Sequence, residues 1–203
     1  MTPFQVLGWV GNACFFSRFL VQWALSERAR RSLTPTVFWR LSLVGTACLG
    51  VYSAQQGKYV LLVGYVLNGT IYARNLWMQR RAGSRTLTPG AAALIALVAV
   101  AGLVAGALLN LRTDPDASAA WVACAGVGQA IWSSRFVVQW WLSERAGESH
   151  FPPAFWWLSL FGNALLLAYA LHLGDPIFIA GFVPGPIVQV RNLMLQRRAT
   201  TRA

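Results

Sequence analysis

The segment from Gly11 to Ala29, GNACFFSRFLVQWALSERA, decides the fold because the chain contains it twice. The segment from Gly128 to Ala146, which lies 117 residues later, reads GQAIWSSRFVVQWWLSERA. The correspondence continues without a gap through a shared FWxLSLxG segment to a final RNL, and nearly half of the aligned positions are identical. Similarity of this extent within one chain indicates an internal duplication. Each copy places an arginine inside an apolar segment, with a glutamine four residues later.

The composition is that of a membrane protein. Hydrophobic residues make up 56% of the 203 residues and charged residues only 11%, whereas about a quarter of the residues in a soluble domain are charged. A helix that spans a bilayer needs about 20 mainly apolar residues. The segments of this kind are 4–25, 37–54, 59–78, 90–111, 120–142, 153–171 and 176–195.

These segments predict an all-α integral membrane protein with seven transmembrane helices. The duplication divides them into a first three-helix repeat (1–85), a linker helix with its loop (86–119) and a second three-helix repeat (120–203). Because a single linker helix restores the direction of the chain, we expect two parallel repeats in a 3+1+3 arrangement. Pro184 and Pro186 remove two backbone donors from the last helix, so we expect a kink there.

The formal net charge is +11, and the distribution of the basic residues along the chain predicts the orientation in the membrane. With the N-terminus outside and the C-terminus in the cytoplasm, the inner loops hold most of the basic residues, as the positive-inside rule requires. The inner set is Arg28, Arg30, Arg31, Arg80, Arg81, Arg85, Arg145, Arg197, Arg198 and Arg202, and the outer loops hold only Lys58 and Arg112. There is no soluble basic domain, so we do not expect nucleic-acid binding.

Arginines inside the apolar segments mark the candidate site, because a charge in a span is costly unless it faces protein, water or a counter-charge. Arg18 and Arg135 form one symmetric pair, Arg74 and Arg191 form another, and Arg40 has no counterpart. Arg18 lies roughly 21 Å from the outer end of its helix at about 1.5 Å per residue. We therefore expect both pairs in the cytoplasmic half of the membrane, around the pseudo-two-fold axis.

Two interpretations of these arginines remain open. In the first, they line a polar cavity between the repeats and bind an anion such as phosphate with bidentate geometry. Neutral hydrogen-bonding groups and two tryptophans that could stack on a sugar complete this candidate site. Its members are Arg18, Gln22, Trp23, Tyr72, Arg74, Asn75, Arg135, Gln139, Trp140, Arg191 and Asn192. In the second, Glu27 and Glu144 at the inner helix ends pair with the arginines and lock the helix packing.

The sequence offers no pattern of catalytic residues. It contains no nucleophile–base pair, no cluster with metal-ligand spacing and no phosphate-binding glycine loop, and its three cysteines are scattered through apolar segments. Acidic residues lie only in loops or at helix ends, which argues against ion coupling through buried carboxylates. We therefore expect a protein that is not an enzyme and that uses neither a metal nor a cofactor.

The motifs resemble a known family. The pattern RFxxQWxxSE, followed by PxxFWxLSLxG and closed by RNL, is similar to the lipid A biosynthesis N-terminal domain family in a tandem form. The three-helix unit also resembles the SemiSWEET and SWEET sugar transporters, although the Pro-Gln dipeptide of that class is missing here. The first resemblance implies handling of a lipid-linked sugar, and it assigns the family's motif residues to Arg18, Arg135, Gln22 and Gln139, with the arginines of the second pair.

The resemblance and the surplus of buried positive charge together favour a transporter or flippase of an anionic lipid-linked sugar, such as a polyprenyl-phosphate glycoside used in envelope glycolipid or lipid A modification. A non-transporting membrane subunit that anchors or regulates a glycosyltransferase partner is one alternative. A neutral-sugar transporter of the SWEET kind is another. In each case we expect a multi-pass protein of the bacterial inner membrane.

Overall fold

The computed structural model describes residues 1–29, 35–80, 89–114, 117–146 and 152–200. Within these ranges the regular elements are all helices, which confirms the all-α prediction. They are α1 (Pro3–Ala29), α2 (Thr36–Gln55), α3 (Tyr59–Arg80), α4 (Pro89–Thr113), α5 (Ala119–Ala146), α6 (Pro153–Leu173), α7 (Pro176–Phe182) and α8 (Pro184–Thr200).

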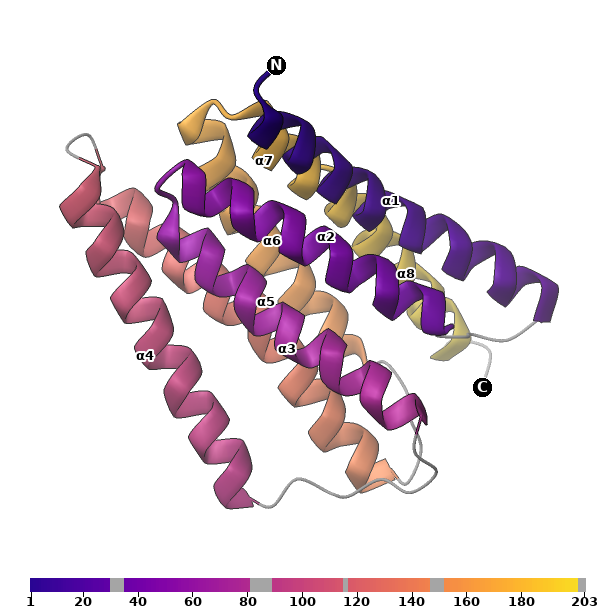
Figure 1. Ribbon diagram of the computed structural model, residues 1–203. Coiled ribbons are helices and arrows are strands. Elements are labelled where there is room, and N and C mark those ends of the chain that lie inside the picture. The colour runs from indigo at the N-terminus through magenta and orange to yellow at the C-terminus, as the bar shows by residue number, and fades with distance from the viewer. Residues whose placement is uncertain (30–34, 81–88, 115–116, 147–151, 201–203) are drawn as a thin grey trace. The chain divides into compact units, whose positions relative to one another are not determined.

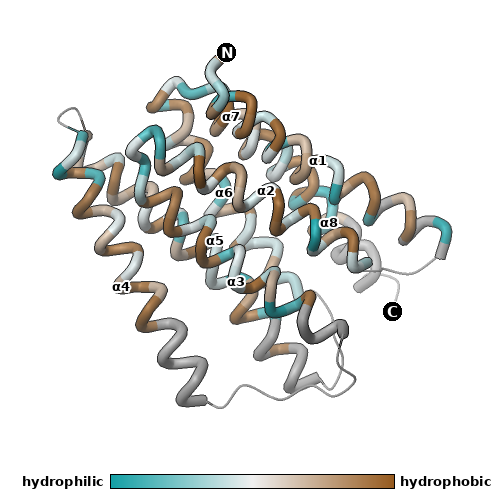
Figure 2. Tube along the Cα trace, in the orientation of Figure 1, coloured by the Kyte–Doolittle hydropathy of each residue, from teal (hydrophilic) through white to brown (hydrophobic). Residues whose placement is uncertain are grey.

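Several helices are long and apolar enough to cross a membrane. Among the described residues these stretches are Pro3–Gln22, Thr36–Gln55, Pro153–Leu173 and Pro176–Met194, and the described part of α4 adds the shorter apolar stretch Leu97–Thr113. Figure 2 shows hydrophobic residues in the coloured C-terminal part of α4 and hydrophilic ones at the turn between α2 and α3. The chain is therefore a helical membrane protein, while the 3+1+3 arrangement stays a prediction.

The chain folds into two compact units, of which the first is Met1–Thr113. Its helices pack in chain order, α1 on α2, α2 on α3 and α3 on α4 (Figure 1). The contact between α1 and α2 is close at two glycines, since a Cβ atom on Gly11 would lie 3.1 Å from the carbonyl oxygen of Gly45. Glycine at both positions therefore allows the two backbones to approach each other.

A buried asparagine joins α4 to the rest of the first unit. Asn110 is 1% exposed. Its Oδ1 accepts a hydrogen bond from the backbone N–H of Val60 at 2.9 Å, and its Nδ2 donates to the carbonyl oxygen of Gly57 at 3.0 Å. The side chain thus satisfies one of the first N–H groups of α3, which lack partners within the helix, and a carbonyl of the turn before α3. These two hydrogen bonds explain why the apolar segment 90–111 contains a polar residue, Asn110.

The second unit, Asp114–Ala203, repeats the packing of the first. Helix α5 packs on α6, and α6 packs on both α7 and α8. The glycine contact recurs, because a Cβ atom on Gly128 would lie 3.3 Å from the carbonyl oxygen of Gly162. The duplication visible in the sequence is therefore a duplication of one three-helix packing unit.

The third helix of the second unit is broken, where the first unit has the continuous helix α3. Helix α7 ends at Phe182 and α8 begins at Pro184, as expected from the two prolines. Pro186 has no N–H to donate to the carbonyl oxygen of Phe182. Asn163 of α6 donates its Nδ2 to that oxygen at 2.8 Å instead. Gly185 leaves room for this amide, because a Cβ atom there would lie 2.7 Å from Oδ1 of Asn163.

We predict that Asn163→Leu lowers the free energy of unfolding by about 1–3 kcal/mol, because it leaves a buried carbonyl without a donor. Pro186→Ala restores a backbone N–H for that carbonyl, so the cost of Asn163→Leu should be smaller in the Pro186→Ala background. Unfolding in detergent micelles of the four proteins of this double-mutant cycle measures the difference.

Asn68→Leu provides the control for this cycle, because Asn68 is a buried amide of the other unit and donates within its own helix to Gly64. Its cost should be the same in the wild-type background and in the Pro186→Ala background. Equal costs of Asn163→Leu in the two backgrounds would show that the amide does not replace the missing donor.

Candidate functional site

Arg18 joins the three helices of the first repeat. It lies on α1, is 8% exposed, and donates through Nη1 to Ser42 Oγ on α2 at 2.9 Å and to Tyr72 Oη on α3 at 3.3 Å. Ser42 in turn donates to the backbone carbonyl of Phe38 at 2.6 Å, which leaves its oxygen free to accept from the guanidinium. One buried cation thus connects helices that follow one another in the chain.

Aromatic rings enclose the same guanidinium. Its Cζ lies 4.4 Å from the ring centre of Phe15, 4.8 Å from that of Phe19 and 5.2 Å from that of Phe38. The negative faces of aromatic rings attract a cation, and the attraction is stronger where water is excluded. Nε of Arg18 is buried and has no hydrogen-bond partner among the described residues. The positive charge is therefore surrounded by hydroxyls and rings, and the buried Nε–H donates to none of the described residues.

Arg135 occupies the corresponding place in the second repeat and is 4% exposed. Its Cζ lies 3.5 Å from the ring centre of Trp132, 4.7 Å from that of Phe136 and 5.8 Å from that of Phe155. Trp132 stands where the first repeat has Phe15, so the stacking ring is larger and closer. Both repeats therefore bury the arginine of the RFxxQW motif against aromatic side chains.

The two arginine environments differ at one position of the third helix. Gln189 stands where the first repeat has Tyr72. It is 4% exposed, and its Oε1 accepts no hydrogen bond within the described part of the chain. Ser159, the counterpart of Ser42, donates to the carbonyl of Phe155 at 2.6 Å. The repeats therefore share the buried arginine and the serine but differ in the side chain that the third helix contributes, Tyr72 or Gln189.

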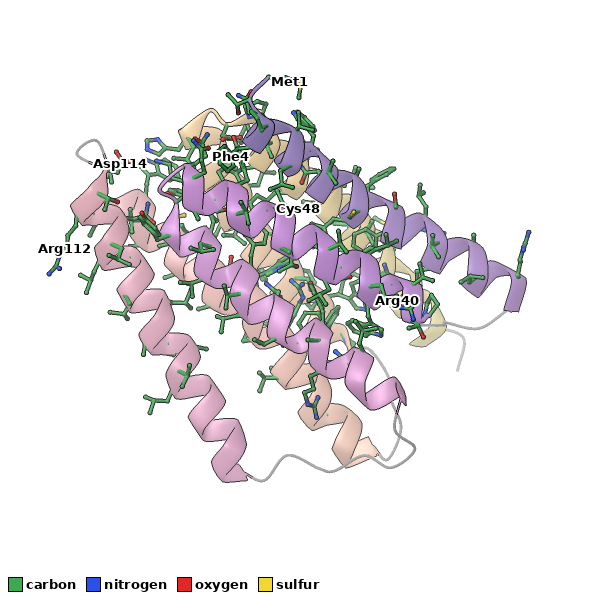
Figure 3. The ribbon with its side chains drawn as sticks, in the orientation of Figure 1. Met1, Phe4, Arg40, Cys48, Arg112 and Asp114 are labelled. Atoms are coloured by element: carbon green, nitrogen blue, oxygen red, sulfur yellow. The ribbon has the colours of Figure 1, made fainter. Side chains whose placement is uncertain are left out.

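The structure does not bring the second pair of arginines into these enclosures. Arg74 is half-buried and Arg191 is exposed. Asn75 and Asn192 donate to carbonyls of their own helices, to Ile71 at 3.0 Å and to Val188 at 2.7 Å. The unpaired Arg40 is also exposed. Figure 3 shows Arg40 and Arg112 toward opposite ends of the first unit.

The remaining predicted members divide into two groups. Gln22 and Gln139 are half-buried on α1 and α5. The side chains of Trp23, Trp140, Glu27 and Glu144 lie outside the part of the chain that the structure describes. The interpretation in which Glu27 and Glu144 pair with the arginines therefore stays a prediction, and so does the stacking of a sugar on the two tryptophans.

Sequence reasoning missed Ser42, which accepts a hydrogen bond from Arg18, and the phenylalanines that surround the cation. A signal for Ser42 was present, because the LSL segment is identical in the two copies of the duplication. The rings carried no such signal, since aromatic residues are frequent throughout the apolar segments. No cluster of three metal-ligating side chains occurs among the described residues.

The fold and the buried cations define a helical membrane protein with a duplicated three-helix unit. The chain belongs to the lipid A biosynthesis N-terminal domain family, whose model matches residues 7–77 and 126–194, one match for each repeat. The resemblance to this family that the sequence motifs indicated is therefore confirmed. No solved structure matches the chain, and the similarity to SWEET proteins stays a prediction.

Curated relatives carry the name lipid-A-disaccharide synthase. The proteins from Chlamydia pneumoniae and Chlamydia trachomatis serovar D are 32% and 30% identical to this chain over 93% and 97% of its length. The protein from Chlamydia felis is 28% identical over 93%. The chain spans about a third of the length of these relatives, 33%, 34% and 32% respectively. These matches relate the chain to lipid A biosynthesis.

The names of the relatives correct one expectation. The lack of a catalytic pattern led us to expect a protein that is not an enzyme, whereas the relatives that match nearly the whole chain are named as an enzyme. That expectation is wrong as an inference from the sequence. A search for catalytic motifs in a chain that corresponds to a third of such a protein tests only that third.

We predict that Ser42→Ala lowers the free energy of unfolding by about 1.5–3 kcal/mol, the usual range for a hydrogen bond to a charged group. Ser159→Ala is the matched control, because the hydroxyl of Ser159 bonds within its own helix. Its cost should stay below about 1 kcal/mol. Thermal unfolding in detergent measures both, and equal costs would mean that Arg18 does not depend on Ser42.

Proposed function

We propose that this protein is a membrane module of lipid A biosynthesis that binds an anionic lipid-linked sugar and works with a glycosyltransferase. One observation carries the proposal: two buried arginines occupy equivalent places in the two repeats. The guanidinium of Arg18 contacts hydroxyls and aromatic rings, and that of Arg135 stacks on aromatic rings. A hydroxyl or a ring does not neutralise a full charge, so the hydroxyls and rings around Arg18 leave its guanidinium with an attraction for an anion.

The chemistry of the guanidinium favours phosphate as that anion. Arginine offers several N–H donors in one plane and binds phosphate with two parallel hydrogen bonds. Inside a membrane, charged side chains often mark a substrate path. A phosphate that joins a sugar to a lipid can bind a guanidinium inside the membrane while the hydrocarbon chain of the lipid stays in the bilayer.

The relatives support the link to a glycosyltransferase. Each has about two thirds of its length beyond the region that this chain matches, and its name describes the synthesis of a disaccharide lipid. A module that holds such a lipid in the membrane would bring its sugar to a catalytic domain at the surface. The excess of arginines at the predicted inner helix ends favours a partner in the cytoplasm and a location in the inner membrane.

Transport of the same lipid is a second candidate function, and the duplication favours it. Proteins with two parallel repeats that are related by an axis along the membrane normal include transporters, in which one repeat moves against the other. The replacement of Tyr72 by Gln189 makes the two halves unequal. This is the expected pattern for one asymmetric substrate, such as a polyprenyl-phosphate glycoside, and it would suit a flippase.

We predict that Arg18→Gln and Arg135→Gln each weaken the binding of phosphatidic acid and of lipid A by at least about tenfold, because each removes a buried cation. Titration of the purified protein in detergent, followed by native mass spectrometry, measures the binding. Arg112→Gln is the matched control, since it removes an exposed arginine near a helix end and should leave both affinities unchanged.

Circular dichroism and thermal unfolding establish whether each variant is folded before its binding is compared. Folded arginine variants that bind both lipids like the wild type would exclude the anion-binding function. Lipid movement across reconstituted vesicles that depends on Arg18 and Arg135 would favour transport. A stoichiometric glycosyltransferase that co-purifies, with no lipid movement, would favour the module.

A further inference from the structure

In the first repeat, some buried polar atoms have no hydrogen-bond partner among the residues that the structure describes. Thr46 on α2 and Asn68 on α3 are each 5% exposed. Thr46 Oγ1 and Asn68 Oδ1 have no hydrogen-bond partner among the described residues, and neither does Nε of Arg18. A buried polar atom without a partner costs about 1–3 kcal/mol, and the hydrocarbon region of a membrane offers no water to supply one.

Thr46 and Asn68 lie on the same helices as the hydrogen-bond partners of Arg18. Thr46 is four residues after Ser42 on α2, and Asn68 is four residues before Tyr72 on α3, so each lies one helical turn from a residue that accepts a bond from Arg18. Because α2 and α3 run in opposite directions, both turns lead toward the same end of the unit, the end with the turn between α2 and α3. The methyl group of Thr46 lies against Gly69, the residue after Asn68.

In the second repeat, the residues at the two corresponding positions take part in a different interaction. Asn163, the counterpart of Thr46, donates to the carbonyl that Pro186 leaves without a partner. Gly185, the counterpart of Asn68, has no side chain and makes room for that amide. Asn163 is therefore engaged in the second repeat. In the first repeat, Thr46 Oγ1 and Asn68 Oδ1 accept no hydrogen bond from the described residues, although the amide nitrogen of Asn68 donates to Gly64.

We propose that Thr46 and Asn68 form a subsite that accepts hydrogen bonds from the sugar of the bound lipid, next to the phosphate held by Arg18, and that only the first repeat has it. This inference rests on the proposed function, because it names the group that lies beside the anion. Thr46 and Asn68 each lie one helical turn, about 5–6 Å, from a residue that bonds to Arg18, so the ligand must carry a donor, a hydroxyl or an amide N–H, at a comparable distance from its phosphate.

A glycosyl phosphate meets this requirement and a simple phospholipid does not. The hydroxyls of a sugar ring lie within that distance of a phosphate attached to the ring, and each can donate to an oxygen such as Thr46 Oγ1 or Asn68 Oδ1. Phosphatidic acid offers the phosphate without the ring. Discrimination between a sugar-bearing and a sugar-free lipid phosphate should therefore depend on these two acceptors.

The experiment measures the ratio of the affinities for lipid A and for phosphatidic acid in detergent. Thr46→Val keeps the shape of the side chain and removes its oxygen, and it should lower the ratio about fivefold while leaving the affinity for phosphatidic acid unchanged. Asn68→Leu should act in the same direction. Thr46→Ser keeps the hydroxyl and should retain the ratio of the wild type.

Ser53→Ala is the control for a buried hydroxyl of α2, because Ser53 already donates to the carbonyl of Leu49. It should not change the ratio. A Thr46→Val protein that keeps the ratio of the wild type would overturn the subsite. Since Thr46→Val removes no hydrogen bond between described residues, it should fold even where Asn68→Leu does not.

The same titrations separate this inference from the proposed function. If Arg18→Gln and Arg135→Gln weaken both lipids while Thr46→Val changes nothing, the anion site stands and the sugar subsite is wrong. If the arginine variants bind both lipids normally, the proposed function itself fails. In that case a changed ratio in Thr46→Val would not rescue the subsite beside Arg18.

Discussion

The structure of each repeat depends on a guanidinium buried among apolar helices. A charge in this place is tolerated only if the surrounding side chains compensate for its loss of water. In the first repeat, hydroxyls from α2 and α3 and the rings of three phenylalanines do so. Because these groups come from all three helices, the cation fixes how the helices meet. In the first repeat, we propose that an anionic lipid binds to this positive charge.

Both repeats contain the buried arginine, but the residues around it differ between them. Both retain the close glycine contact between the first two helices, at Gly11 with Gly45 and at Gly128 with Gly162. Around Arg135, however, a tryptophan replaces a phenylalanine as the nearest ring. The third helix is also broken between α7 and α8, where an asparagine of α6 supplies the missing donor. Duplication therefore gave two copies of a scaffold, and later substitutions made their interiors unequal.

The helices were accessible to prediction because apolar length and charge distribution are local properties of the chain. The predicted segments 37–54, 59–78 and 153–171 lie within α2, α3 and α6. The two prolines correctly indicated an irregular last helix, since proline removes a donor whatever surrounds it. The expectation that the protein is not an enzyme was wrong, because the lack of a motif in this chain says nothing about the rest of relatives about three times its length.

The sequence by itself determined the duplication, the membrane helices and the presence of an arginine inside each repeat, because these follow from composition and spacing along the chain. Only the tertiary structure decided what surrounds those arginines. Arg18 bonds to residues 24 and 54 positions away, and no periodicity records which hydroxyl of a distant helix accepts the bond. For the same reason, only the folded chain shows that Asn163 is engaged while Thr46 Oγ1 and Asn68 Oδ1 accept no hydrogen bond from the residues that the structure describes. Hydrogen bonding across helices depends on packing, and packing is a property of the whole unit.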